Sequence, residues 1–140
     1  MKIPFSPPYI DQSVIDEVVD SLKSGWITTG PKCKLLEAEL KEYTGAQQVL
    51  TVNSWTSGAI LMLSWLGVKP GDEVIVPAYT YSATALAVLH AGAKPIMVDV
   101  GMDFNISVEA IRKAITSRTK AIIPVDIAGF PCDYESIMSI

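Results

Sequence analysis

The sequence predicts an α/β fold, a mostly parallel sheet flanked by helices on both faces. From residue 48 onward, short apolar runs of strand length alternate with helical patterns of about ten residues, and this alternation is typical of βαβ units. The chain has 140 residues, 49% of them apolar, so a core can form without disulfide or metal staples. Its mean hydropathy of +0.33 is high for a monomer and predicts an apolar face that self-association or further chain would cover.

Residues 1–30 are predicted to form an extended arm, a helix and a turn-rich connector. Three prolines fall within residues 1–10, and proline does not fit a helix interior. After Asp11, apolar residues recur at spacings of three and four, which predicts a helix that ends at Gly25. These apolar residues are Val14, Ile15, Val18, Val19 and Leu22. The connector, GWITTGP over residues 25–31, precedes a second predicted helix over residues 32–43 that stops at Gly45.

The remaining chain is predicted as alternating strands and helices. The predicted strands cover residues 48–53, 71–77, 94–100 and 120–126. The predicted helices cover residues 57–66, 82–90 and 107–115, and another begins at Tyr134. No repeat, low-complexity tract or linker interrupts this series. We therefore expect no domain boundary within residues 1–140.

Charge and cysteine content narrow the possible partners. A net charge of −4 disfavours binding to nucleic acid, which needs clustered basic residues. Cys33 and Cys132 are too few for a disulfide framework or a zinc site, so we expect free thiols and no metal. The N-terminus lacks a signal-peptide pattern, and no segment approaches the roughly 18 apolar residues that span a bilayer. The sequence predicts a cytoplasmic protein without a membrane partner.

The strongest site signal is the predicted passage from strand to helix at residues 52–60, VNSWTSGAI. In open α/β sheets, ligands bind beyond the carboxyl ends of strands, where helix N-termini attract anions. Ser54, Thr56, Ser57 and Gly58 would suit a phosphate there. Capping of the helix by Ser54 or Thr56 explains the same residues, and the pattern leaves both readings open. The sequence contains neither G-x-G-x-x-G nor a Walker motif, which disfavours a dinucleotide or triphosphate site.

Two further groups of residues follow predicted strands. Tyr79 and Tyr81 occur in PAYTYSAT, where stacking of one ring on a flat ligand, worth about 1 kcal/mol, competes with plain core packing. Asp126 stands at a strand end before the small segment AGFP. For Asp99 and Asp103, a turn in which each bonds its own backbone is favoured over a metal site.

Taken together, the segments resemble the N-terminal part of the DegT/DnrJ/EryC1/StrS family of pyridoxal-phosphate-dependent sugar aminotransferases. The resemblance runs in the family's order over essentially all 140 residues. The matching stretches are IPFSPPYID, SGWITTGPKCKLLEAEL, VNSWTSGAI, GVKPGDEVIVPAYTYSATALAVLHAGAKPIMVDV and FNISVEAIRKAITSRTKAIIPVDIAGFPCDYESI.

The resemblance implies that residues 1–140 are part of the large domain of a fold type I transferase. It also implies that the protein acts as a homodimer with active sites shared between the subunits. It implies that the loop Ser54, Trp55, Thr56 and Ser57 binds the phosphate of pyridoxal 5'-phosphate and that Tyr81 stacks on its ring. It implies substrate contacts for Trp26, Thr28, Thr29 and Asp126. Many members carry His in place of Asp126 and a small residue in place of Trp55, which suggests a subgroup.

The resemblance also implies the reaction, transfer of an amino group, typically from glutamate, to a nucleotide-linked keto sugar in polysaccharide or amino-sugar biosynthesis. Such chemistry needs a Schiff-base lysine and an acid at the pyridine nitrogen. None of the nine lysines matches the family's lysine motif, so the sequence predicts an N-terminal portion with half a cofactor site and no catalytic residue. The alternative is a non-catalytic module that binds a phosphate ligand or forms dimers.

Overall fold

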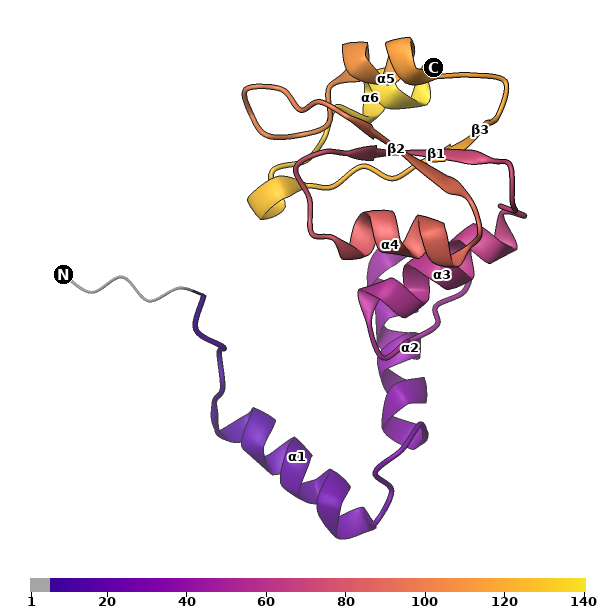
Figure 1. The fold of residues 1–140 in the computed structure, drawn as a ribbon. Helices are drawn as coiled ribbons and strands as arrows, with labels where there is room; N and C mark the ends of the chain where they lie inside the picture. The colour runs from indigo at the N-terminus through magenta and orange to yellow at the C-terminus, as the bar shows by residue number, and fades with distance from the viewer. Residues whose placement is uncertain (1–5) are drawn as a thin grey trace, which may run out of the picture. The chain divides into compact units, whose positions relative to one another are not determined.

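The structure, a computed structural model, describes residues 6–140. It contains a parallel three-stranded sheet with helices on both faces (Figure 1), which confirms the predicted fold class. Residues 1–5 of the predicted extended arm lie outside the described residues, and residues 6–10 form neither helix nor strand. The chain divides into two compact units, one up to Thr51 and one from Val52 to Ile140. Compactness does not test independent folding, so the absence of a domain boundary stays a prediction.

The first unit contains two capped helices, α1 (Gln12–Ser24) and α2 (Pro31–Thr44). The Asp11 side chain accepts a hydrogen bond from the Val14 N–H at 3.1 Å, which satisfies one free donor of the first turn. Gly25, at φ 72°, adopts the left-handed conformation that ends α1. Both helices were predicted, and the structure confirms them.

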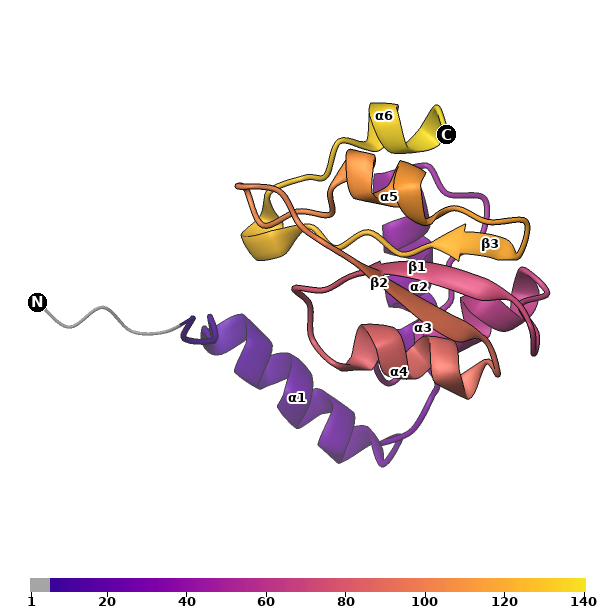
Figure 2. The same cartoon turned by 45° about the horizontal axis from the view of Figure 1, so that its top comes forward.

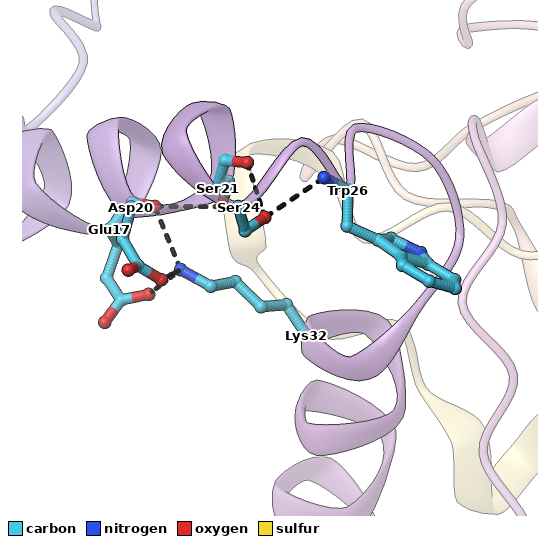
Figure 3. Close-up of polar contacts among 6 residues, drawn as sticks. All are labelled: Glu17, Asp20, Ser21, Ser24, Trp26 and Lys32. Atoms are coloured by element: carbon cyan, nitrogen blue, oxygen red, sulfur yellow. Dashed lines mark hydrogen bonds and ion pairs between the residues drawn. The ribbon is translucent and has the colours of Figure 1, made fainter.

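Lys32 at the start of α2 joins the two helices of the first unit. Its Nζ lies 2.5 Å from a Glu17 carboxylate oxygen and 2.9 Å from one of Asp20 (Figure 3). It also donates to the Glu17 carbonyl at 3.0 Å. Because these side chains are largely exposed, water and salt weaken both ion pairs. The contacts therefore link α1 and α2 but add little to the stability of the unit.

The second unit is built around β1 (Glu73–Pro77). It pairs in parallel with β2 (Lys94–Val98) and β3 (Thr119–Ile122), so the strand order is β2-β1-β3. Helices α3 (Trp55–Trp65) and α4 (Ala83–His90) cover one face, while α5 (Val108–Ala114) and α6 (Tyr134–Met138) cover the other (Figures 1 and 2). A short 3-10 turn, η1 (Ile127–Gly129), follows β3.

The alternation of side chains along β1 divides the core into two parts. Val74 and Val76 point to the α3 and α4 side, where they pack with Leu63 and Val88. Ile75 points to the other face and packs with the α5 and α6 residues of the second cluster. All five residues of β1 are buried. A strand buried on both faces needs helices on both sides, which is why the sequence pattern alternates as it does.

One predicted strand is wrong. Residues 48–53 form no strand, and most of them are exposed. An extended apolar segment becomes a strand only where a neighbour pairs with its backbone, and within the described residues no strand pairs with this one. The other three predicted strands are confirmed, although β1 begins later than predicted and β2 and β3 end earlier. Helix α3 begins two residues before its predicted start at Ser57.

The two cysteines, the search for membrane spans and the turn after β2 bear on further expectations from the sequence. Cys33 and Cys132 are free, as expected, and Cys132 is buried. Within residues 6–140, no helix is both long and apolar enough to cross a bilayer. The turn after β2 is confirmed for Asp103, which accepts a hydrogen bond from the Asn105 N–H at 3.1 Å. Asp99 takes part through its backbone carbonyl, which accepts from the Ser107 N–H at 3.1 Å, and not through its side chain as expected.

Glu73, at the start of the central strand, is the buried charge of the second unit. It is 3% exposed and accepts hydrogen bonds from Thr116 Oγ1 at 2.6 Å and from Arg118 Nη2 at 2.5 Å. The Thr116 hydroxyl, followed by the Arg118 guanidinium, lowers the pKa of Glu73 below its ordinary value of 4.5. These contacts fasten the beginning of β3 to β1 at the amino-terminal edge of the sheet.

Truncation of the central strand should strongly destabilise the second unit. Ile75→Ala removes a fully buried side chain and should cost about 2–5 kcal/mol of unfolding free energy. Met102→Ala is the control, because Met102 is 98% exposed and its loss should change stability by no more than about 0.5 kcal/mol. Urea unfolding followed by circular dichroism measures both. Equal effects of the two substitutions would contradict the described core.

The contribution of Glu73 should depend on pH. Because folding lowers its pKa, its stabilisation is present above the unfolded value and is lost as the pH falls through the lower folded value. Glu73→Gln should therefore destabilise the protein at pH 7, and the difference from wild type should shrink by pH 3. Thermal unfolding at several pH values measures it. A difference that does not change with pH would show that the charge of Glu73 is not involved.

Candidate functional site

A cavity of about 610 Å³ lies where the second unit brings three segments together. They are the start of α3, the loop between β1 and α4, and the segment after β3. The loops that follow the strands emerge at one end of the sheet (Figure 1), as parallel pairing requires. The lining residues that carry polar or aromatic groups are Trp55, Thr56, Thr80, Tyr81, Thr84, Asp126 and Tyr134. Four of these were predicted site residues: Trp55, Thr56, Tyr81 and Asp126.

Ser54 caps α3 next to the cavity. Its backbone is extended at φ −161°, and its side chain accepts a hydrogen bond from the Ser57 N–H at 3.1 Å. The first N–H groups of a helix have no partner within it. Among the described residues, those of Trp55 and Thr56 therefore remain for an outside acceptor, while that of Ser57 is satisfied.

The hydroxyl groups of Ser54 and Ser57 also contact each other, with their oxygens 3.0 Å apart. Two hydroxyls carry two protons, and their mutual hydrogen bond uses one of them. The other proton remains for a ligand. Capping and anion binding, the two readings left open by the sequence, are thus compatible at this helix end.

The two tyrosines in the loop after β1 have different surroundings. Tyr79 packs against Phe104, with ring centroids 5.4 Å apart at 44°. Tyr81 instead lines the cavity and is 82% exposed. The loop is held at its base by Thr80 and the buried Thr84, whose hydroxyl oxygens lie 2.8 Å apart. Of these two tyrosines, Tyr81 therefore presents its ring to a ligand in this cavity and Tyr79 does not.

Asp126 is fixed by residues that the sequence reading missed. One of its oxygens, Oδ1, accepts hydrogen bonds from the Cys132 N–H at 2.9 Å and from the Tyr134 hydroxyl at 3.0 Å. The other, Oδ2, lies 3.1 Å from the same hydroxyl. The Cys132 N–H is the largest cause that lowers the pKa of Asp126, so the carboxylate is ionised at neutral pH. Spacings of six and eight residues gave no signal for these contacts.

A buried amide holds the loop that carries Asp126. Asn105, 3% exposed, donates to the carbonyls of Phe130 at 3.0 Å and Pro131 at 3.2 Å, and accepts from the Ile127 N–H at 3.1 Å. These bonds clamp both ends of η1, inside which Ala128 has a left-handed backbone at φ 52°. Such a conformation persists in a non-glycine residue only where its surroundings enforce it.

The predicted substrate residues Trp26, Thr28 and Thr29 belong to the first unit. Trp26 and Thr28 line a separate cavity of about 630 Å³ in that unit. The Trp26 indole N–H donates to the Thr29 carbonyl at 3.0 Å. Its backbone N–H donates to the Ser24 hydroxyl at 3.1 Å (Figure 3). A Cβ on Gly30 would lie 1.8 Å from the indole nitrogen, so this position admits only glycine while Trp26 keeps its place.

Comparison with known proteins gives consistent results. The chain is 46% identical over 136 residues to the UDP-4-amino-4-deoxy-L-arabinose–oxoglutarate aminotransferase of Shewanella sediminis, covering 96% of this chain and 35% of that protein. It is 39% identical over 139 residues to the spore coat polysaccharide biosynthesis protein SpsC of Bacillus subtilis, covering 99% and 36%.

A solved structure gives the same result. Spr1654 of Streptococcus pneumoniae, a protein assigned to the sugar aminotransferases, superposes in its PMP form with a TM-score of 0.93 at 50% identity, over 100% of this chain and 36% of its own. The chain thus spans about a third of the length of these relatives. Residues 8–140 match the DegT/DnrJ/EryC1/StrS aminotransferase family, and we conclude that the chain belongs to this family.

Proposed function

We propose that the chain forms part of an aminotransferase that moves an amino group, typically from glutamate, to a nucleotide-linked keto sugar in polysaccharide or amino-sugar biosynthesis. The observation that carries this proposal is the cavity, which combines a helix N-terminus, an exposed tyrosine ring and an ionised carboxylate. Family membership supports it, as do the sugar-related names of the relatives from Bacillus subtilis and Shewanella sediminis.

The cofactor of this proposal is pyridoxal 5'-phosphate, and the residues at the cavity fit it. The free N–H groups of Trp55 and Thr56, with the hydroxyls of Ser54 and Ser57, would hold its phosphate at the positive end of the α3 dipole. The exposed ring of Tyr81 would lie against the pyridine ring. When bound, the cofactor supplies an electron sink for amino transfer.

The substrate side of the proposal rests on Asp126 and on the first unit. As an ionised carboxylate at the cavity wall, Asp126 accepts hydrogen bonds and would receive one from a sugar hydroxyl. Trp26, Thr28 and Thr29 remain substrate candidates, supported by the cavity that Trp26 and Thr28 line.

We propose that residues 1–140 supply half of the cofactor site. Amino transfer requires a lysine that binds the cofactor and carries a proton, and an acid that keeps the pyridine nitrogen protonated. Among residues 6–140, no lysine lines the cavity in the second unit. Within the described part of the chain, the residues that would bind the phosphate and stack on the ring are therefore present without a lysine at the cavity.

We also propose that the protein acts as a homodimer. The apolar residues that recur along one side of α1 are exposed: Val18 is 55% exposed and Leu22 is 64% exposed. Such a stripe is costly to leave in water. A second copy of the chain would cover it without any added component, and two-fold dimers are the commonest assemblies of this kind.

Ser54→Ala tests the phosphate site. The substitution removes the cap of α3 and should cost about 1 kcal/mol of unfolding free energy. It should also weaken pyridoxal 5'-phosphate binding by about tenfold, because a hydroxyl contact to a charged group is lost. Ser64→Ala, on the exposed side of the same helix, is the matched control and should leave both values unchanged. Absorbance titration of the complete gene product measures the affinity; equal affinities for all three proteins would contradict the site.

The half-site proposal predicts that residues 1–140 alone form no specific covalent bond with the cofactor. The 140-residue chain is incubated with pyridoxal 5'-phosphate, reduced with borohydride and analysed by peptide mass spectrometry. Excess inorganic phosphate serves as the control, since adducts that depend on the phosphate site disappear in its presence and random surface adducts do not. A single phosphate-sensitive lysine adduct, together with turnover of glutamate, would overturn the proposal.

A further inference from the structure

The hydrogen bonds that hold the Asp126 carboxylate leave acceptor capacity open on Oδ2. Each carboxylate oxygen can accept about two hydrogen bonds. Oδ1 accepts one from the Cys132 N–H at 2.9 Å. The Tyr134 hydroxyl carries a single hydrogen, and its oxygen lies 3.0 Å from Oδ1 and 3.1 Å from Oδ2. Whichever oxygen takes that hydrogen, Oδ2 keeps at least one unused acceptor position, in a side chain that lines the cavity.

Tyr134 donates from a fixed position. It is the first residue of α6, whose start is capped by Asp133 through the Ser136 N–H at 3.0 Å. The same helix is anchored to the core by Ile137, which is 8% exposed and packs in the cluster with Ile75. The preceding chain is fastened as well, because Asn105 binds the carbonyls of Phe130 and Pro131.

The hydroxyl of Tyr134 remains a donor at neutral pH. Burial, followed by the nearby charge and hydrogen bond of Asp126, raises the pKa of Tyr134 above its ordinary value of 10.0. A protonated phenol can donate only one hydrogen, and here both oxygens of Asp126 are within its reach. The contact therefore orients the carboxylate plane as well as stabilising its charge.

We propose that Tyr134 is a positioning residue for substrate recognition: its hydroxyl orients Asp126 so that Oδ2 accepts a hydrogen bond from a hydroxyl of the sugar. This inference rests on the proposed function. The ligand class follows from the chemistry of the cavity, because an ionised carboxylate selects a hydrogen-bond donor and the exposed faces of Trp55 and Tyr81 suit a flat or polyhydroxylated ring. Tyr134 contributes to binding through Asp126 and takes no part in proton transfer.

A double-mutant cycle on the complete gene product tests the proposal. The variants are Tyr134→Phe, Asp126→Asn and their combination, assayed in the reverse direction with UDP-4-amino-4-deoxy-L-arabinose and oxoglutarate, the reactants in the name of the Shewanella sediminis relative. Tyr134→Phe should raise KM about tenfold, the value of one charge-assisted hydrogen bond, and change kcat by less than about threefold. The double variant should resemble Asp126→Asn, because Tyr134 acts through that carboxylate. Tyr43→Phe is the matched control, since Tyr43 is 89% exposed on α2, and should behave as wild type.

Two results would overturn the proposal. One is an unchanged KM in Tyr134→Phe, and the other is full additivity of the two substitutions, which would mean that Tyr134 and Asp126 act independently. Affinity for pyridoxal 5'-phosphate, measured by absorbance on the same samples, should be equal in wild type and Tyr134→Phe. A wild-type protein that binds no pyridoxal 5'-phosphate would contradict the proposed function itself, so the two failures are distinguishable.

Discussion

The parallel pairing of β1 with both of its neighbours is the constraint on which the second unit depends. Ile75 lies opposite Ile96 on one side and Ile122 on the other, so β1 has no free edge and no exposed face. Parallel neighbours must be joined by crossover segments, which supply the helices on both faces. The same pairing sends the chain out of every strand at one edge, and the cavity with Tyr81 and Asp126 lies there.

Structure and site use the same side chains at this edge. Ser54 stabilises α3 by accepting from Ser57, yet this contact leaves neighbouring N–H groups and one hydroxyl proton for a ligand. Asp126 similarly fastens the chain near Cys132 while keeping at least one acceptor position on Oδ2. A residue that caps a helix or holds a loop is therefore not excluded from binding. Its structural contact fixes the geometry that binding needs, as expected for a site held by the scaffold.

Local patterns predicted much of the fold. Helices α1 and α2 were predictable because their caps, Asp11, Gly25 and Gly45, act within a few residues of the helix. Residues 48–53 were predicted wrongly as a strand because strand formation depends on a partner, which periodicity does not report. The contacts of Asn105 with Phe130 and Pro131 span 25 and 26 residues, and no local pattern indicates them. At the cavity, local patterns already made Thr56, Tyr81 and Asp126 candidates, because each follows a predicted strand. Tyr134 was not predicted, because its contact with Asp126 spans eight residues and follows no local pattern.

The central claim is that the start of α3 binds the phosphate of the cofactor, whose ring lies beside Tyr81. The sugar substrate then binds next to the cofactor and contacts Asp126. A crystal structure of the complete gene product with pyridoxal 5'-phosphate tests it most directly. The account predicts phosphate oxygens within hydrogen-bond distance of the Trp55 and Thr56 N–H groups and a pyridine ring against Tyr81. A cofactor phosphate bound at any other element, with the start of α3 left to solvent, would contradict it.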